Sequence, residues 1–171
     1  MTSIVKATIQ DYQLISDIGK TTFVESHGHS ATKEVINEYV QEKFNLNAVK
    51  DELSSPENIY RIIFYRNQPA GYSKIILNSG HPAISTAEVT KLERIYLLKE
   101  FYKLKFGSML FDHNLDLSKS QHQNGMWLFT WKENNRAIEF YQKKGFNIIG
   151  SYEFKLTETH SNPNYLMFLE Y

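Results

Sequence analysis

The sequence predicts an α/β fold, and three observations support this class. An apolar, β-rich run at Leu92–Leu98 leads through a short basic turn into a helical pattern from about Phe106 to Ser120. A run of bulky β-formers at 125–131, GMWLFTW, follows and completes a central β-α-β unit. The other β-rich runs are separated by short turns, so antiparallel strands are expected to flank this unit.

The first half is predicted to hold one strand, two helices and a β-hairpin. Helices are expected where apolar residues recur at helical spacing behind polar residues that can cap them. The expected elements are a strand at 3–8, a helix at about 10–25, a loop at 26–34, a second helix to about 44 capped by Ser30 or Thr32, a short turn at 49–53, and hairpin strands at 59–65 and 70–77 across a four-residue turn, Arg66 to Pro69.

The second half is predicted to alternate strands and helices. A strand within 83–98 precedes the helix at 106–120, and the strand at 125–131 precedes a second helix that Lys132 to Asn134 open. Gly145 is expected to end that helix as a left-handed cap. Two further strands are expected at 147–154 and 164–171. No repeat, linker or low-complexity tract interrupts the chain, so we expect one domain over residues 1–171.

Composition limits the partners that the protein can have. Nineteen basic and nineteen acidic residues balance, so no global field favours nucleic acid or an anionic membrane. The chain has no cysteine, which excludes disulfides and thiolate chemistry. Its start, MTSIVKATIQ, lacks a signal-peptide pattern, and no apolar run approaches the ~20 residues of a membrane span. We therefore expect a soluble, cytoplasmic protein.

The run Lys103 to Phe111, KLKFGSMLF, holds a basic turn and the start of a helix, and it follows the β-rich run at Leu92–Leu98. This order of strand, turn and helix suits the binding of an anion. The first N–H groups of a helix have no partner within it and lie at the positive end of its dipole. The signal is weak alone, because many connections between a strand and a helix look the same.

The segments ERIYLLKEFYKLKFGSMLF (93–111) and ENNRAIEFYQKKGF (133–146) together resemble the Gcn5-related N-acetyltransferase (GNAT) superfamily. Its pattern is a strand, then Gln/Arg-x-x-Gly-x-Gly/Ala, then Asn-x-x-Ala-x-x-x-Tyr-x-x-x-Gly-Phe, and the second part fits at every position. More narrowly, the sequence is similar to bacterial polyamine N-acetyltransferases of the PaiA kind. The resemblance implies a GNAT fold with a central mixed and splayed sheet of six to seven strands, flanked by about four helices.

The first part of the family pattern is altered in this chain. Tyr102 replaces the usual Gln or Arg, and Lys105 replaces the first glycine, so that only Gly107 remains. Glycine lets a backbone approach phosphate closely. Lysine at 105 is expected to hold an ordinary helical φ and to present its ammonium to a phosphate instead. Coenzyme A binding is then expected to survive. The alternative is a degenerate turn in a non-catalytic acyl-CoA-binding or interaction module.

The resemblance also implies where acetyl-CoA binds. The strand at 92–97 would splay from the strand at 127–131, and the pantetheine arm would pair with backbone in the gap. Backbone N–H groups of the turn would take the pyrophosphate, Asn134 would anchor the pantetheine, and Lys143 would meet the nucleotide. The implied cofactor-binding residues are Ile95, Tyr96, Leu97, Lys103, Leu104, Lys105, Phe106, Gly107, Ser108, Asn134, Ala137, Phe140 and Lys143.

Acetyl transfer to an amine by direct attack in a ternary complex needs a base and an acid. An alkyl amine titrates near ~10.4, so about one molecule in a thousand is neutral at pH 7. Glu93, placed by alternation on the face opposite Arg94, is the candidate base, and Tyr141 is the candidate proton donor to the leaving thiolate. A solvated or ion-paired strand glutamate and a core tyrosine are the structural alternatives.

The acceptor is predicted less sharply than the cofactor. A polyamine such as spermidine or spermine would need carboxylates and aromatic faces. Peptide N-termini, aminoglycosides and other small amines stay open, as does a homodimer. His27 and His29 form His-x-His, but no third ligand is nearby, so no metal is expected. The candidate substrate-binding residues are Glu25, His29, Tyr39 and Trp131.

Overall fold

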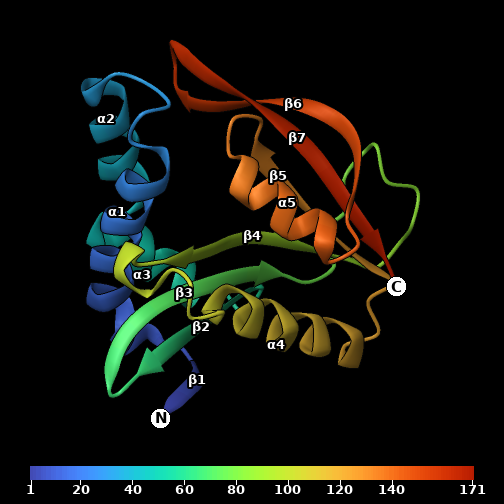
Figure 1. The fold of residues 1–171 in the computed structure, drawn as a ribbon, viewed down its shortest axis with the longest axis horizontal. Helices are drawn as coiled ribbons and strands as arrows, with labels where there is room; N and C mark the ends of the chain where they lie inside the picture. The colour runs from blue at the N-terminus through green and yellow to red at the C-terminus, as the bar shows by residue number, and fades with distance from the viewer. The chain divides into compact units, whose positions relative to one another are not determined.

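The computed structural model describes all residues, 1–171, and has seven strands and five α-helices (Figure 1). The predicted α/β class is confirmed. In chain order the elements are β1 (Thr2–Lys6), the 3₁₀ turn η1 (Ile9–Asp11), α1 (Tyr12–His27), α2 (Lys33–Lys43), α3 (Leu46–Ser54), β2 (Asn58–Tyr65), β3 (Gln68–Ile76), β4 (Val89–Leu97), the 3₁₀ turn η2 (Lys99–Phe101), α4 (Phe106–Ser120), β5 (Gly125–Trp131), α5 (Asn135–Lys143), β6 (Asn147–Thr157) and β7 (His160–Glu170).

The strands form one mixed sheet in the order β1-β2-β3-β4-β5-β7-β6. β4 and β5 are parallel and are connected through α4, whereas β1 with β2, β5 with β7 and β6 with β7 are antiparallel. The central β-α-β unit with flanking antiparallel strands is therefore confirmed.

The ladder between β4 and β5 is short. It joins Val89 to Gly125, Thr90 to Met126 and Lys91 to Trp127, and it ends there although both strands continue. By contrast, β5 pairs with β7 along its whole length, from Gly125 to Trp131. β5 is buried along nearly its whole length, as the run of bulky β-formers predicts.

Two local predictions in the first half are wrong. The turn between β2 and β3 has two residues, Arg66 (φ 49°) and Asn67 (φ 62°), not four. Left-handed φ at both positions is typical of a type I′ turn, whose twist matches that of the strands. The expected short turn at 49–53 is a full helix, α3, because Asn45 accepts a hydrogen bond from the N–H of Ala48 and caps it.

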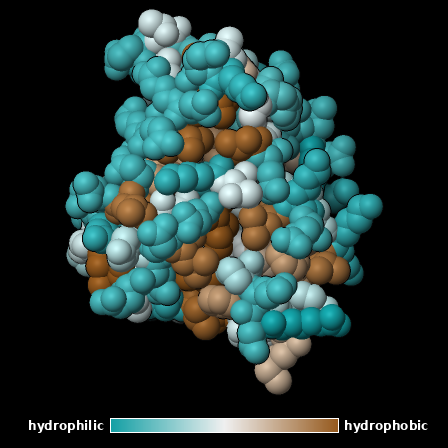
Figure 2. Space-filling view, turned by 90° about the vertical axis from the view of Figure 1, so that its left-hand side faces the viewer, coloured by the Kyte–Doolittle hydropathy of each residue, from teal (hydrophilic) through white to brown (hydrophobic).

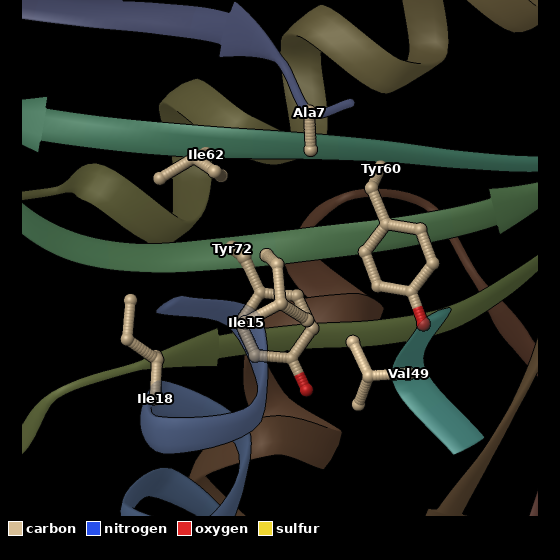
Figure 3. Close-up of a cluster of buried hydrophobic side chains, with 7 residues drawn as sticks. All are labelled: Ala7, Ile15, Ile18, Val49, Tyr60, Ile62 and Tyr72. Carbon is tan, nitrogen blue, oxygen red and sulfur yellow. The ribbon is translucent and has the colours of Figure 1, made fainter. Parts of the chain in front are cut away.

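The chain forms two compact units, residues 1–75 with 94–114, and residues 76–93 with 115–171. One domain over 1–171 stays a prediction. The core of the first unit joins α1 and α3 to the strands: Ile15 and Ile18 meet Val49, Tyr60 and Tyr72, and all are nearly or fully buried (Figure 3). This contact explains the apolar stripe along α1.

A second cluster of the first unit holds the start of α4. Phe106 and Leu110 of this helix pack with Phe101 of η2, and Ile95 and Leu97 of β4 contact the same cluster. The end of β4 and the start of α4 are thus fixed to one another within the first unit.

The second unit has its own apolar cluster and a buried polar network. Val89, Trp127 and Leu166 form the cluster. Thr90 Oγ1 lies 2.7 Å from Ser118 Oγ of α4, which lies 2.6 Å from the hydroxyl of Tyr171. The network satisfies polar groups that burial would otherwise penalise.

Figure 2 shows the side of the molecule that carries α1, α2 and α3. Hydrophilic residues dominate the upper part and the edges of this face, and apolar residues form a larger brown area in the lower middle of the view. The helices therefore have the amphipathic character that their spacing predicts, with polar residues toward solvent.

Replacing Gly19 with alanine is expected to destabilise the first unit. The added Cβ would lie 2.4 Å from Cδ1 of Phe44, a fully buried ring that has no room to move. Overpacking of this kind costs about 1–3 kcal/mol and outweighs the better helix propensity of alanine. Urea unfolding followed by circular dichroism measures the loss.

Gly80→Ala is the matched control for this substitution. A Cβ at Gly80 would meet no atom within 4 Å. The free energy of unfolding should therefore stay within about 0.5 kcal/mol of the parent protein. Equal stability of the two variants would contradict the packing argument.

Candidate functional site

The turn between β4 and α4 is left-handed at two lysines. Lys103 has φ 71° and Lys105 has φ 60°. The expectation of an ordinary helical φ at Lys105 is wrong. A left-handed conformation costs a residue with a Cβ roughly 1–2 kcal/mol, so the turn geometry is imposed by the packed elements on either side. Gly107 is not left-handed, and a Cβ there would make only ordinary contact with Leu97, at 3.6 Å.

Helix α4 begins with unused backbone donors. Its first hydrogen bond runs from the N–H of Met109 to the carbonyl of Lys105, at 3.1 Å. The N–H groups of Phe106, Gly107 and Ser108 precede this bond and so have no acceptor within the helix. The exposed lysines of the turn add positive charge at the end of the helix that favours anions. This arrangement can hold a phosphate.

The last residues of β4 alternate between two clusters of the first unit. Ile95 and Leu97 pack on the cluster that holds α4, whereas Tyr96 packs on the cluster with α1. A Cβ on Gly71 of β3 would lie 2.3 Å from the carbonyl oxygen of Tyr96, so only glycine lets β3 approach this closely. The backbone at 95–97 is thus rigidly supported.

Three predicted acceptor residues lie in the first unit, at different depths. The carboxylate of Glu25 accepts the N–H of Lys99 at 2.9 Å and so ties α1 to the turn that follows β4. Tyr39 is buried and stacks on Phe23 with ring centroids 4.6 Å apart, whereas His29 is exposed. Glu25 and Tyr39 therefore both have structural contacts.

His27 was weighed from the sequence only as a metal ligand, and its ring contacts were missed: it stacks on Phe23 with centroids 4.8 Å apart and meets the edge of Tyr96 at 6.2 Å. Burial, with a smaller effect of His29, lowers the pKa of His27 to about 4, so the imidazole is neutral near pH 7. Nδ1 of His27 lies 2.7 Å from Ser26 Oγ, and this hydroxyl also lies 2.7 Å from the carbonyl oxygen of Thr22. The four-residue spacing from Phe23 was the available signal.

A buried ion cluster of the first unit was also missed. Arg94 of β4 donates two hydrogen bonds to Glu52 of α3, at 3.0 and 3.3 Å, and Lys74 of β3 lies 3.1 Å from the same carboxylate. Tyr60 donates to it as well. Burial opposes the charge of Glu52, but the two cations outweigh it and hold the pKa of this carboxyl below its usual range.

The predicted residues near α5 lie in the second unit. The side-chain oxygen of Asn134 accepts the N–H of Ala137 at 3.2 Å and caps α5. Tyr141 lies edge-on to Phe140 at 5.1 Å and to Phe146 at 5.5 Å.

Further positions complete this description of the second unit. Gly145 has φ 96°, which confirms the predicted left-handed cap. Lys143 is exposed on α5, and Trp131 is buried at the end of β5.

Glu93, the predicted base, also lies in the second unit. Its Oε1 is 3.2 Å from Nζ of Lys91, and the two side chains are 25% and 23% exposed. Lys91 in turn lies over the ring of Trp127, 5.3 Å from its centroid. Lys91 was not predicted from the sequence as a site residue. Its spacing of two residues from Glu93 on a strand was the available signal, because such residues share a face.

No three or more His, Asp or Glu side chains gather in a way that could hold a metal ion. No helix is long and apolar enough to cross a membrane.

Comparison with known proteins gives a consistent family. Residues 20–146 match the acetyltransferase (GNAT) family. The chain is 23% identical over 153 residues to an uncharacterized N-acetyltransferase in the pepI 3′ region of Lactobacillus delbrueckii subsp. lactis, covering 90% of this chain and 88% of that one.

Solved structures with the same fold include two acetyltransferases. PaiA N-acetyltransferase from Thermoplasma acidophilum, in complex with coenzyme A, has a TM-score of 0.79 at 18% identity and covers 100% of this chain and 99% of that chain. The ribosomal-protein-S18-alanine N-acetyltransferase from Escherichia coli has a TM-score of 0.72 at 15% identity, with 99% and 94% covered. Because the family match spans well over half of the sequence, the chain belongs to the acetyltransferase (GNAT) family.

Proposed function

We propose that the protein is an acetyl-CoA-dependent N-acetyltransferase that acts in the cytoplasm on a primary amine of a small molecule, by direct transfer in a ternary complex. The observation that carries the proposal is the left-handed turn at Lys103 and Lys105, which leads into the unused N–H groups of α4. The likeness to the PaiA protein, solved with coenzyme A, supports the cofactor.

The residues of this chain fit the cofactor in chemical type. Backbone donors from Lys103 to Ser108 would hold the pyrophosphate, with Leu104 and Phe106 fixing the turn. Backbone groups of Ile95, Tyr96 and Leu97 would pair with the pantetheine arm. When bound, acetyl-CoA supplies an acetyl thioester.

Residues of α5 and its cap complete the proposed cofactor contacts. The amide nitrogen of Asn134 would donate to the pantetheine, because its oxygen already caps the helix. Ala137 and Phe140 would contact the arm, and Lys143 would meet the nucleotide.

The proposed proton transfers use one carboxylate and one phenol. Oε of Glu93 would take one proton from the acceptor ammonium and so supply the neutral amine. The hydroxyl of Tyr141 would give its proton to the sulfur that leaves as the new C–N bond replaces the C–S bond, and the second proton that the nitrogen loses would restore this hydroxyl. General acid and base catalysis of this kind contributes about two to four powers of ten in rate.

Polyamines are the first acceptors to test, because the PaiA likeness and the candidate groups Glu25, His29, Tyr39 and Trp131 suggest them. Peptide N-termini, aminoglycosides and other small amines are the alternatives. A non-catalytic acyl-CoA-binding or interaction module is the competing function, suggested by Tyr102 and Lys105 at positions where the family pattern has Gln or Arg and a glycine.

Acetyl-CoA is expected to raise the melting temperature of the protein. A ligand that binds only the folded state stabilises it by about 2.7 kcal/mol at a concentration of 100 times its dissociation constant. Absence of a shift at millimolar acetyl-CoA would contradict both the enzyme and the binding module. Thiol release with a panel of amines then separates them, because only the enzyme consumes the thioester.

Tyr141→Phe is expected to lower kcat by about tenfold to a thousandfold while the affinity for acetyl-CoA changes little. The ring contacts with Phe140 and Phe146 survive this substitution, whereas the proposed proton donor is removed. Tyr165→Phe, which also removes one hydroxyl in the second unit, is the control and should keep full activity. An unchanged kcat would remove Tyr141 from its proposed role.

Lys105→Gly is expected to raise stability and to weaken coenzyme A binding. Glycine has no penalty at φ 60°, so relief of strain should add about 1 kcal/mol to the free energy of unfolding. The lost ammonium should reduce coenzyme A affinity about threefold to tenfold and flatten its dependence on salt. Calorimetry with coenzyme A and with pantetheine, which has no phosphate, measures this. Equal losses for both ligands would contradict a phosphate contact.

A further inference from the structure

The pair of Lys91 and Glu93 is held in a defined place on β4. Their charged atoms are 3.2 Å apart, and both side chains lie on the same side of the strand because two residues separate them. Thr90 contacts Ser118 of α4, so Lys91 points away from that helix. The pair lies immediately at the point where the ladder between β4 and β5 ends, at Lys91 and Trp127.

Aromatic rings hold the ammonium of Lys91. Its Nζ lies 5.3 Å from the ring centroid of Trp127 and 5.8 Å from that of Phe129, both within cation–π range. The indole N–H of Trp127 donates to the carbonyl of Ser79 at 2.6 Å, which fixes the ring. This lysine is therefore ordered, unlike an ordinary surface lysine, and it retains donors beyond the one that it gives to Glu93.

An apolar surface lies beside the charged pair. Phe129 stacks on Tyr152 with ring centroids 4.3 Å apart, and Tyr152 is 47% exposed. His81 meets the edge of Trp127 at 5.0 Å. The second unit thus presents a carboxylate, an ammonium and accessible aromatic surface together.

A simple surface ion pair explains this arrangement poorly. Exposed ion pairs contribute little to stability, and they do not require aromatic rings next to the cation. Adjacent opposite charges next to an apolar surface are instead complementary to a zwitterion with an apolar group. An α-amino acid carries its two charges on either side of a single carbon, so they can meet two side chains that lie in contact.

We infer that the acceptor is an amine with a neighbouring carboxylate and an apolar side chain, that is, an α-amino acid or a close analogue. This inference rests on the proposed acetyltransferase function. Glu93 receives the amino group, Lys91 binds the carboxylate and the rings of Phe129 and Tyr152 contact the side chain. The ammonium of Lys91 would then disfavour polycations, because it repels their further positive charges next to Glu93.

The test compares L-phenylalanine with phenethylamine, which differ only in the carboxylate, and with spermidine. Thiol release should give phenylalanine a kcat/KM about tenfold to a hundredfold above that of phenethylamine, the effect of one charge-assisted hydrogen bond. Lys91→Met should remove this preference by raising KM for phenylalanine more than KM for phenethylamine, whereas any change in kcat that follows from removing the partner of Glu93 should be the same for both amines. Lys91→Arg should restore part of it.

Lys119→Met is the matched control, because Lys119 also lies over a ring, Tyr171, at 5.1 Å. It should leave the preference unchanged. Equal use of phenylalanine and phenethylamine, better use of spermidine, or equal loss for both amines in Lys91→Met would overturn the inference while leaving the acetyltransferase function intact.

A binding measurement separates this inference from the proposed chemistry. In the presence of coenzyme A, phenylalanine should raise the melting temperature of the parent protein more than phenethylamine does, and Lys91→Met should abolish the difference. This difference in melting temperature, seen without any thiol release, would support an α-amino acid as the ligand and contradict the proposed acetyltransferase activity. Equal shifts for the two ligands would overturn the acceptor class, whatever the activity.

Discussion

The first unit depends on the carboxylate of Glu52. Arg94 and Lys74 are both almost fully buried, and each meets Glu52 within about a hydrogen-bond length. Burying a cation without a partner is among the largest penalties in folding, so β3 and β4 must carry these residues to α3 or not fold as they do. The same contact fixes Arg94, and therefore the direction of its neighbours Ile95 and Tyr96. The backbone at Ile95 and Tyr96, a proposed contact of the pantetheine arm, is thus held in place by the ion pair between Arg94 and Glu52 of α3.

Features that depend on residues close together in the sequence were predicted, whereas contacts between residues far apart in the sequence were not. Helix α4, the start of α5 just after Lys132 to Asn134 and the left-handed Gly145 rest on groups a few residues apart, and each was predicted. The pairing of Glu52 with Arg94 spans forty-two positions, and no local pattern reveals it. The stack of Phe23, His27 and Tyr96 was missed for the same reason, since only folding brings α1 to β4.

The φ of Lys105 was predicted wrongly because it depends on the turn in which this residue lies and not on the preference of lysine alone. Lysine prefers a negative φ, but Phe101 and Phe106 are packed at the two ends of the connection, and Lys105 between them has φ 60°. A backbone conformation set by tertiary packing can therefore persist after its glycine is gone, at an energetic cost borne by the rest of the fold. The anion-binding geometry and the family pattern of residues are separable properties.

Both tryptophans of the chain lie on β5, as Trp127 and Trp131, and both are buried in the second unit. Ultraviolet emission excited at the indole band thus reports on that unit alone. The first unit has no indole and is seen instead through its tyrosines and its helices. The two tryptophans are therefore an intrinsic fluorescence probe of the second unit. Comparing their signal with the circular dichroism of the helices shows whether the two units unfold cooperatively, without any introduced dye.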